Sequence, residues 1–228
     1  MSVRLGYRRS RDTARIAWRN LRCRGLTEAD VAALYERTYH DERGYTASSE
    51  HERAIKDAHA EFIVRNTTPA KVLVAGCSAG DLLVALEERG VEAWGFDISP
   101  DLDALCLPAV RDRLRHGSMT AIPYSPEDRF DAVVATDVFE HVPRRSIPGM
   151  VAELARLNAP HLVTLIDHVS LLDPGHVTLM PLSWWRARLQ GVYALRPERA
   201  LRRDPPLGLY GLDPANPNQL LRVWDRAR

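Results

Sequence analysis

The sequence is poor in cysteine and has no cysteine pair. Its 228 residues include only three cysteines, which are odd in number and widely separated: Cys23, Cys77 and Cys106. Disulfide frameworks of small secreted domains and structural zinc sites depend on closely spaced cysteines. We therefore expect three free thiols and no structural zinc.

The chain also lacks a long apolar run and an excess of charge of one sign. No stretch reaches the roughly 18 apolar residues of a membrane-spanning helix, and no apolar core of a signal peptide is found. The formal net charge of +1 gives no reason to expect nucleic acid or an anionic membrane as a partner. We therefore predict a cytoplasmic protein. Arginines gather in residues 1–24 and 186–203, and we interpret the first group as a solvated or poorly ordered leader.

The GxGxxG turn of nicotinamide-binding proteins is absent, and a different glycine turn is present. The apolar run Val72–Ala75 leads into Gly76 and Gly80, and residues 81–89 have helical character, so the segment predicts strand, tight turn and helix. Gly76 lets the backbone approach a ligand, and Gly80 permits close packing of the helix. Asp97 ends a second strand-like segment, where a carboxylate can accept both hydroxyl hydrogens of a ribose.

Two later segments give the glycine turn a more specific meaning. Leu114–Met119 is typical of a third strand with an adenine loop, and Phe130–Pro143 of a fourth strand that enters a helix. With them, residues 70 to 195 resemble the class I S-adenosylmethionine-dependent methyltransferases, whose usual motifs are VLDxGCGxG and FDxVxxxxVLEHV. The chain departs from the first motif at Val74, which replaces the acid that commonly orients the cofactor's amino group, and at Ser78, which replaces the middle glycine.

The resemblance implies S-adenosylmethionine as cofactor and S-adenosylhomocysteine as product. It places Ser118 and Met119 at the adenine, and Ile98 on the other face of the ring. Thr136 and Asp137 would hold the amino group and partly replace the missing acid. Residues 39–45 are either a lid over the cofactor or an ordinary loop. The complete set of expected cofactor-binding residues is Tyr45, Gly76, Cys77, Ser78, Gly80, Asp97, Ile98, Ser118, Met119, Thr136 and Asp137.

The alternation of strand and helix patterns predicts an α/β fold with a parallel sheet covered by helices on both faces. Strands are expected near residues 71–75, 92–96, 113–117, 131–136 and 161–167, and helices near 27–39, 49–64, 79–89, 101–111, 144–157 and 182–190. By resemblance, the sheet is Rossmann-like and seven-stranded, with residues 192–195 and 219–224 forming a final antiparallel pair. We divide the chain into residues 1–66, the basic leader and lid helices, and 67–228, the methyltransferase core with an acceptor-side cap.

Two histidines follow the fourth and fifth strands, at the sheet edge where open parallel sheets bind ligands. His141 occupies a position where the resembling family often carries a Glu-His pair, and His176 ends a DPxH-like segment that the family also shows. Each is a candidate base for the proton of a hydroxyl or amine acceptor. The alternative for each is a purely local role in fixing the backbone.

A magnesium ion held by nearby oxygen ligands is a further alternative. The candidates are Asp137, Asp167, His168 and Asp173. No contiguous ligand motif supports the ion, so we expect no metal.

The sequence therefore predicts a methyltransferase that acts on oxygen, nitrogen or carbon of a small molecule, such as a sugar, a polyketide or another specialised metabolite. Three alternatives remain open. The arginine-rich amino terminus would suit an RNA or protein methyltransferase, Val74 and Ser78 would suit a noncatalytic partner subunit, and a nicotinamide-dependent reductase is disfavoured by the glycine spacing. A homodimer is also left open.

Overall fold

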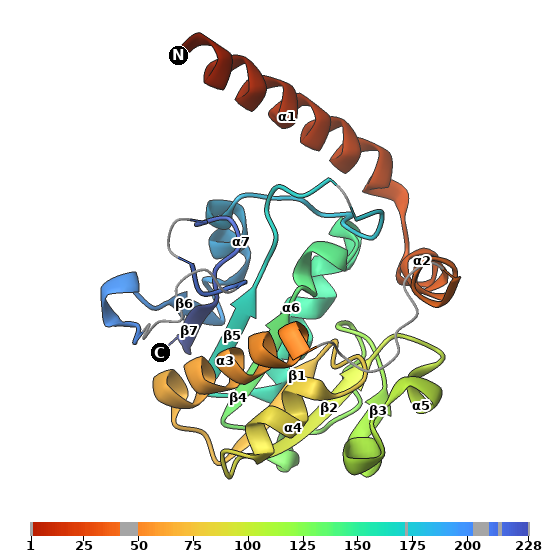
Figure 1. Cartoon of the computed structure of the whole chain (residues 1–228), viewed down its shortest axis with the longest axis vertical. Helices are drawn as coiled ribbons and strands as arrows, with labels where there is room; N and C mark the ends of the chain where they lie inside the picture. The colour runs from red at the N-terminus through yellow and green to blue at the C-terminus, as the bar shows by residue number, and fades with distance from the viewer. Residues whose placement is uncertain (1, 42–49, 172, 203–209, 214–215, 228) are drawn as a thin grey trace.

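The computed structural model describes residues 2–41, 50–171, 173–202, 210–213 and 216–227. Its centre is a seven-stranded sheet with the strand order β3-β2-β1-β4-β5-β7-β6 (Figure 1). The strands are β1 (Lys71–Ala75), β2 (Glu92–Asp97), β3 (Leu114–His116), β4 (Ala132–Thr136), β5 (His161–Leu165), β6 (Tyr193–Leu195) and β7 (Arg222–Arg226). Neighbours among β1 to β5 are parallel, whereas β7 is antiparallel to both β5 and β6. The predicted fold class is confirmed.

The sheet is buried on both faces because successive side chains of each strand point in opposite directions. Val72 and Val74 of β1 belong to the apolar cluster that contains α3 (Glu50–Thr67) and α4 (Asp81–Glu87). Leu73 and Ala75 belong to the other cluster, with α6 (Ile147–Leu157) and α7 (Leu182–Leu189). Both layers are needed because these strands have no polar face.

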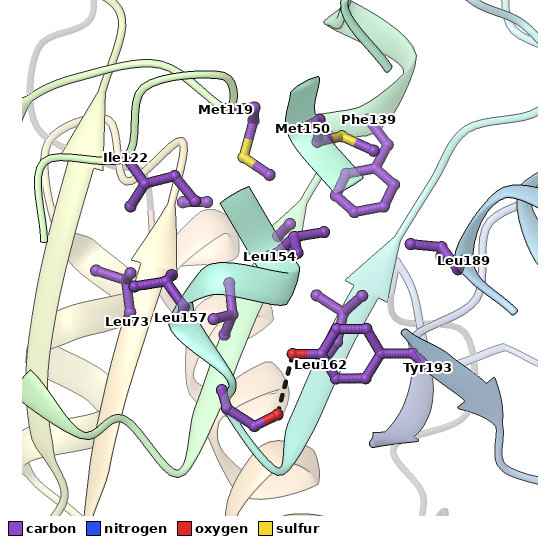
Figure 2. Close-up of a cluster of buried hydrophobic side chains, with 14 of the residues drawn as sticks. Leu73, Met119, Ile122, Phe139, Met150, Leu154, Leu157, Leu162, Leu189 and Tyr193 are labelled. Atoms are coloured by element: carbon purple, nitrogen blue, oxygen red, sulfur yellow. Dashed lines mark hydrogen bonds between the residues drawn. The ribbon is translucent and has the colours of Figure 1, made fainter. Parts of the chain in front are cut away.

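Figure 2 shows how the second cluster anchors the antiparallel end of the sheet. Leu154 and Leu157 of α6 pack with Leu162 of β5, and Tyr193 of β6 lies beside them with its ring fully buried. The Tyr193 hydroxyl donates to the Ala159 carbonyl oxygen at 3.0 Å, so the one polar atom of this side chain is satisfied. Burying a leucine side chain stabilises a fold by about 1.5–3 kcal/mol.

Two predicted helices differ in length from the structure because of proline. The helix expected over residues 101–111 is split into α5 (Leu102–Leu105) and a 3-10 helix (Pro108–Arg113). Leu107, which precedes Pro108, is extended with ψ 134°, as steric contact with the proline ring favours. The helix expected from residue 144 begins at Ile147, with a proline in its first turn, after a 3-10 turn at Arg144–Ser146.

The amino-terminal leader is a helix and not an unordered segment. Helix α1 (Ser2–Arg22) extends away from the sheet and is followed by α2 (Glu28–Asp41) (Figure 1). The predicted capping arrangement before α2 is present, since the Thr27 amide donates to Asp30 and the Asp30 amide donates to the Thr27 hydroxyl. Within the part of the chain that the structure describes, every helix is too short or too polar to cross a lipid bilayer.

Candidate functional site

The glycine turn after β1 is shaped by two left-handed glycines. Gly76 has φ +63° and Gly80 has φ +95°. A Cβ at Gly76 would lie 2.5 Å from Val138, and a Cβ at Gly80 would lie 2.5 Å from Val110. The predicted close helix packing at Gly80 is thus present, and at Gly76 the close neighbour within the chain is the loop after β4. Ser78, in place of the family's middle glycine, also adopts left-handed backbone with φ +48°.

Asp97 joins the end of β2 to this turn. Its Oδ2 accepts the Ser78 amide and its Oδ1 accepts the Ser99 amide, each at 2.9 Å. Burial raises the pKa of Asp97, and the two backbone amides act in the opposite direction by stabilising the carboxylate. The carboxylate is therefore held in one orientation at the carboxyl end of the sheet.

A cavity of about 340 Å³ opens at this edge of the sheet. Most of the predicted site residues line it: Gly76, Ser78, Asp97, Ile98, Ser118, Met119, Thr136, Asp137, His141 and His176. Cys77 and Gly80 are not among its lining residues. The Cys77 side chain is buried in the core, where burial raises the pKa of its thiol, so it is a packing residue and not a nucleophile. Tyr45 lies outside the described residues.

Several lining residues were not predicted, because they come from segments distant in the sequence. Lys56 reaches the cavity from α3, and Tyr210 from the segment before β7. The Tyr210 hydroxyl donates to Asp137 Oδ1 at 2.5 Å. Burial raises the pKa of Asp137 to about 6, while the Tyr210 hydrogen bond and the charge of Lys56 lower it. A tyrosine and a lysine in these segments carry no sequence signal that links them to β4.

Helix α2 covers another side of the cavity. Glu28 in its first turn accepts a hydrogen bond from the Thr120 hydroxyl at 2.7 Å, which ties the helix to the predicted adenine loop. Tyr35, farther along, lies with its ring centre 5.6 Å from that of His141. The covering element is therefore α2 itself; the proposed lid over residues 39–45 lies largely outside the described residues.

The two candidate histidines lie together. The ring centres of His141 and His176 are 4.7 Å apart, and both side chains are buried. Burial, and next the nearby His176, lower the pKa of His141 to about 4. His176 Nδ1 lies 3.0 Å from the Ser170 carbonyl oxygen. Glu140, which is fully buried, accepts the Asp167 amide through Oε1 at 2.7 Å, and burial raises its pKa well above the usual value.

The loop that carries His176 is held by the end of α1. The Arg19 guanidinium donates to the carbonyl oxygens of His176 at 3.1 Å and Asp173 at 2.6 Å, and also to Leu171. Asn20 exchanges two hydrogen bonds with the Leu179 backbone, at 2.7 and 2.9 Å. The amino-terminal helix thus supports the site indirectly, because it holds the backbone of the loop that carries His176.

The magnesium alternative is not supported by the positions of its four residues. Both oxygens of Asp167 accept hydrogen bonds, Oδ1 from the amides of Val169 and Ser170 and Oδ2 from Gln219. His168 Nδ1 lies 2.8 Å from the Met180 carbonyl oxygen. Asp167 and His168 thus order nearby backbone, and none of the four candidates belongs to the group of described side chains whose donor atoms lie within 4.8 Å of one another.

The comparisons with known proteins agree with this architecture. Residues 47–204 match the family described as methyltransferase domain, which is more than half of the chain. The chain belongs to this family. The motifs predicted a class I S-adenosylmethionine-dependent methyltransferase, and this prediction is confirmed.

Two curated relatives of this methyltransferase are O-methyltransferases by name. The ubiquinone biosynthesis O-methyltransferase of Methylococcus capsulatus is 30% identical over 118 residues, which cover 47% of this chain and 47% of that protein. The magnesium-protoporphyrin O-methyltransferase of Synechocystis is 25% identical over 140 residues, or 55% of this chain and 61% of that protein. The methyltransferase thus matches less than two thirds of the length of either relative.

Solved structures share the fold at lower identity. Magnesium protoporphyrin IX methyltransferase from Synechocystis with bound S-adenosylmethionine has a TM-score of 0.61 at 16% identity, covering 90% of this chain and 98% of that one. The PH0226 protein of Pyrococcus horikoshii has a TM-score of 0.63 at 15% identity, covering 89% and 100%. These similarities establish the fold of the methyltransferase.

Proposed function

We propose that this protein transfers the methyl group of S-adenosylmethionine to an oxygen atom of a small, largely apolar molecule. One observation carries the proposal: a single cavity is lined both by the glycine turn at Gly76 and Asp97 and by the paired histidines, His141 and His176. Methyl transfer needs mainly alignment of the acceptor with the methyl–sulfur bond, and removal of a proton where the acceptor is a hydroxyl. The cavity brings a cofactor-binding end and a proton-handling end together.

At the cofactor end, we assign Asp97 to the ribose hydroxyls, Ser118 and Met119 to one side of the adenine, and Ile98 to the other. Cys77 and Gly80 support the turn from behind, through packing and backbone. These roles follow from the family resemblance and from the positions of the side chains around the cavity.

The missing acid of the first motif has a substitute in this proposal. Val74 is 1% exposed and its side chain belongs to the core under α3 and α4. Asp137, oriented by Tyr210, and the neighbouring Thr136 supply oxygen atoms in the same cavity. We assign Asp137 to the cofactor's amino group, which makes the noncatalytic alternative unnecessary.

The acceptor end is assigned from its lining. Val31 and Tyr35 of α2 and Val142 present apolar surface, and a cavity of about 340 Å³ suits a small molecule. Among the described residues that line it, His141 and His176 are the imidazoles, so we assign them to the loss of the acceptor's proton. The names of the two curated relatives, both O-methyltransferases, favour oxygen over nitrogen and carbon.

The cytoplasmic location and the division of the chain at residue 66 stay predictions.

Calorimetric titration with S-adenosylmethionine and S-adenosylhomocysteine, with reduced nicotinamide cofactor as control, tests the cofactor end first. We expect micromolar binding of the two methionine-derived ligands alone. A panel of phenols, catechols and hydroxy acids then tests the acceptor end, with mass spectrometry of the methylated product. Folded protein that binds neither methionine-derived ligand would instead support the partner-subunit hypothesis.

Changing His176 to glutamine is expected to lower turnover about 100-fold with unchanged cofactor affinity, because proton transfer contributes about 10²–10⁴-fold. His161→Gln is the matched control, since this histidine pairs with Asp225 on β7 and is not among the residues that line the cavity. Equal turnover of both variants would remove the assignment.

A further inference from the structure

We propose that Glu140, His141 and His176 bind one divalent transition-metal ion at the acceptor end of the cavity. The ion's catalytic role rests on the proposed function, but its binding does not and can be tested alone.

The three side chains already place donor atoms close together. One ligand atom of each lies within 4.8 Å of the others, and all three residues are buried. Two donors at the tetrahedral angle around one ion, each at about 2.1 Å, are about 3.4 Å apart. A closing movement of up to about 1.4 Å therefore brings the most distant pair within range of one ion.

Glu140 is the strongest indication of a cation. It is fully buried, Oε1 accepts the Asp167 amide, and Oε2 has no hydrogen-bond partner among the residues that the structure describes. An ionised Oε2 is an acceptor without a donor, and a protonated one is a donor without an acceptor. Either state costs about 1–3 kcal/mol in a buried site. The nearby Asp137 and Asp167 add negative charge, so a bound cation resolves both the missing partner and the repulsion.

One of the two histidines, His176, is arranged as metal ligands usually are, and the other has an unpartnered ring nitrogen. His176 Nδ1 faces the Ser170 carbonyl oxygen at 3.0 Å, which favours a proton on Nδ1 and leaves Nε2 with a free lone pair. His141 Nδ1 has no partner that meets hydrogen-bond geometry among the described residues, and the nearby Gly175 amide donates to Asp173. A Cβ at Gly175 would lie 2.8 Å from this nitrogen, so only glycine leaves the space beside it open.

The backbone holds the ligands together across a long sequence separation. The amides of Val177 and Thr178, just after His176, both donate to the Glu140 carbonyl oxygen at 2.9 Å. These bonds join the loop after β4 to the loop after β5 independently of any ion. The ligand set is therefore preorganised, and this lowers the cost of binding.

The donor types indicate the class of ion. Imidazole suits zinc, iron, copper and nickel, whereas magnesium and calcium prefer oxygen ligands, so two imidazoles and one carboxylate favour a transition metal. Three protein ligands leave coordination positions open. His141 and His176 line the cavity, so these positions face the acceptor.

The ion would act on the acceptor oxygen as a Lewis acid. A hydroxyl bound to it loses its proton to water at lower pH, so the two histidines would promote the loss of this proton through the ion and not as bases themselves. The oxygen then attacks the methyl carbon, the oxygen–carbon bond forms as the carbon–sulfur bond breaks, and the electron pair stays on sulfur. The products are the methyl ether, S-adenosylhomocysteine and one released proton.

The test uses the full chain after chelator treatment and dialysis. Zinc is titrated by calorimetry, and cobalt(II) by its visible absorption, without cofactor or acceptor. We expect one equivalent to bind, and binding to weaken 100-fold or more in Glu140→Gln and His176→Gln. His168→Gln is the matched control, because His168 is a buried histidine outside the cluster. This variant should bind the ion as tightly as the unmodified chain. Circular dichroism checks the fold, and His141→Asn replaces any variant that fails to fold.

Absence of stoichiometric zinc or cobalt binding by the folded chain overturns the inference, as does equal binding by the folded variants. Methyl transfer by chelator-treated protein that holds no metal ion also overturns the inference of a metal site, and it leaves the proposed function standing. Stoichiometric ion binding by protein that binds no S-adenosylmethionine supports the metal site and overturns the proposed function.

Discussion

Replacing Asp97 with alanine is expected to weaken S-adenosylmethionine binding by about two orders of magnitude. The carboxylate is fixed by the Ser78 and Ser99 amides and lines the cavity, where we propose that its remaining acceptor capacity binds the ribose. Hydrogen bonds to charged groups are worth about 1.5–3 kcal/mol each. Loss of two ribose contacts, partly offset by water, is then about 3 kcal/mol, or roughly 100-fold in Kd.

The same substitution leaves two backbone amides without their acceptor, so the fold must be checked by thermal unfolding before affinity is interpreted. Glu92→Ala is the matched control, because it removes an exposed acid at the start of the same strand, where Lys71 and Trp94 are its partners. Calorimetry with S-adenosylmethionine and S-adenosylhomocysteine measures the effect, and the control should stay within twofold of the unmodified chain. Unchanged affinity in folded Asp97→Ala protein would refute the ribose assignment.

Three further outcomes follow from the geometry around the cavity. Ser78→Gly should raise the free energy of unfolding by about 0.5–1 kcal/mol, because it relieves left-handed backbone at φ +48°. A lower free energy of unfolding, measured by chemical denaturation, would contradict this. The pKa of Asp137 is raised to about 6, so its carboxylate is present above that pH and lost below it; cofactor affinity should fall as pH drops through 6. In Tyr210→Phe the pH at which cofactor affinity is half lost should be higher, because the hydroxyl that stabilises the Asp137 carboxylate is gone. An unchanged midpoint would count against Asp137 as a ligand of the cofactor. Arg19→Ala should lower turnover with little change in cofactor affinity, since three hydrogen bonds to the loop that carries His176 are lost; equal loss of both would indicate general unfolding.

Local patterns predicted the parts of the molecule that are built from local interactions. The apolar runs of β1 and β4, the glycine turn and the position of Asp97 all lie within short segments whose periodicity carries the information. Errors occurred where a single residue overrides such a pattern. Pro108 divides a helix that periodicity alone predicted as continuous.

The site was only half predictable because its second half is assembled across the chain. His141 and His176 could be named from their motifs, but their contact with Glu140 depends on backbone bonds between two loops. Tyr210 reaches Asp137 from the far end of the sequence, and Arg19 reaches the histidine loop from a helix that composition suggested was unordered. A single sequence carries no signal for these pairings, since each residue type is ordinary in its own segment.

The missing acid of the family motif acquires an explanation in this arrangement. Val74 removes an acid from β1, and the cavity instead holds a carboxylate at Asp137, directly after β4 and three residues before Glu140. Asp137 thus lies close to Glu140, and burial, and next the charge of Asp137, raise the pKa of Glu140 well above its usual value. Two cations are expected at these carboxylates: the cofactor's amino group at Asp137 and a metal ion at Glu140. If both bind, each should weaken the other, because each neutralises part of the negative charge that attracts the other and the two cations repel. Calorimetric titration of S-adenosylmethionine with and without zinc would measure this coupling, and equal affinity under both conditions would separate the two carboxylates into independent sites.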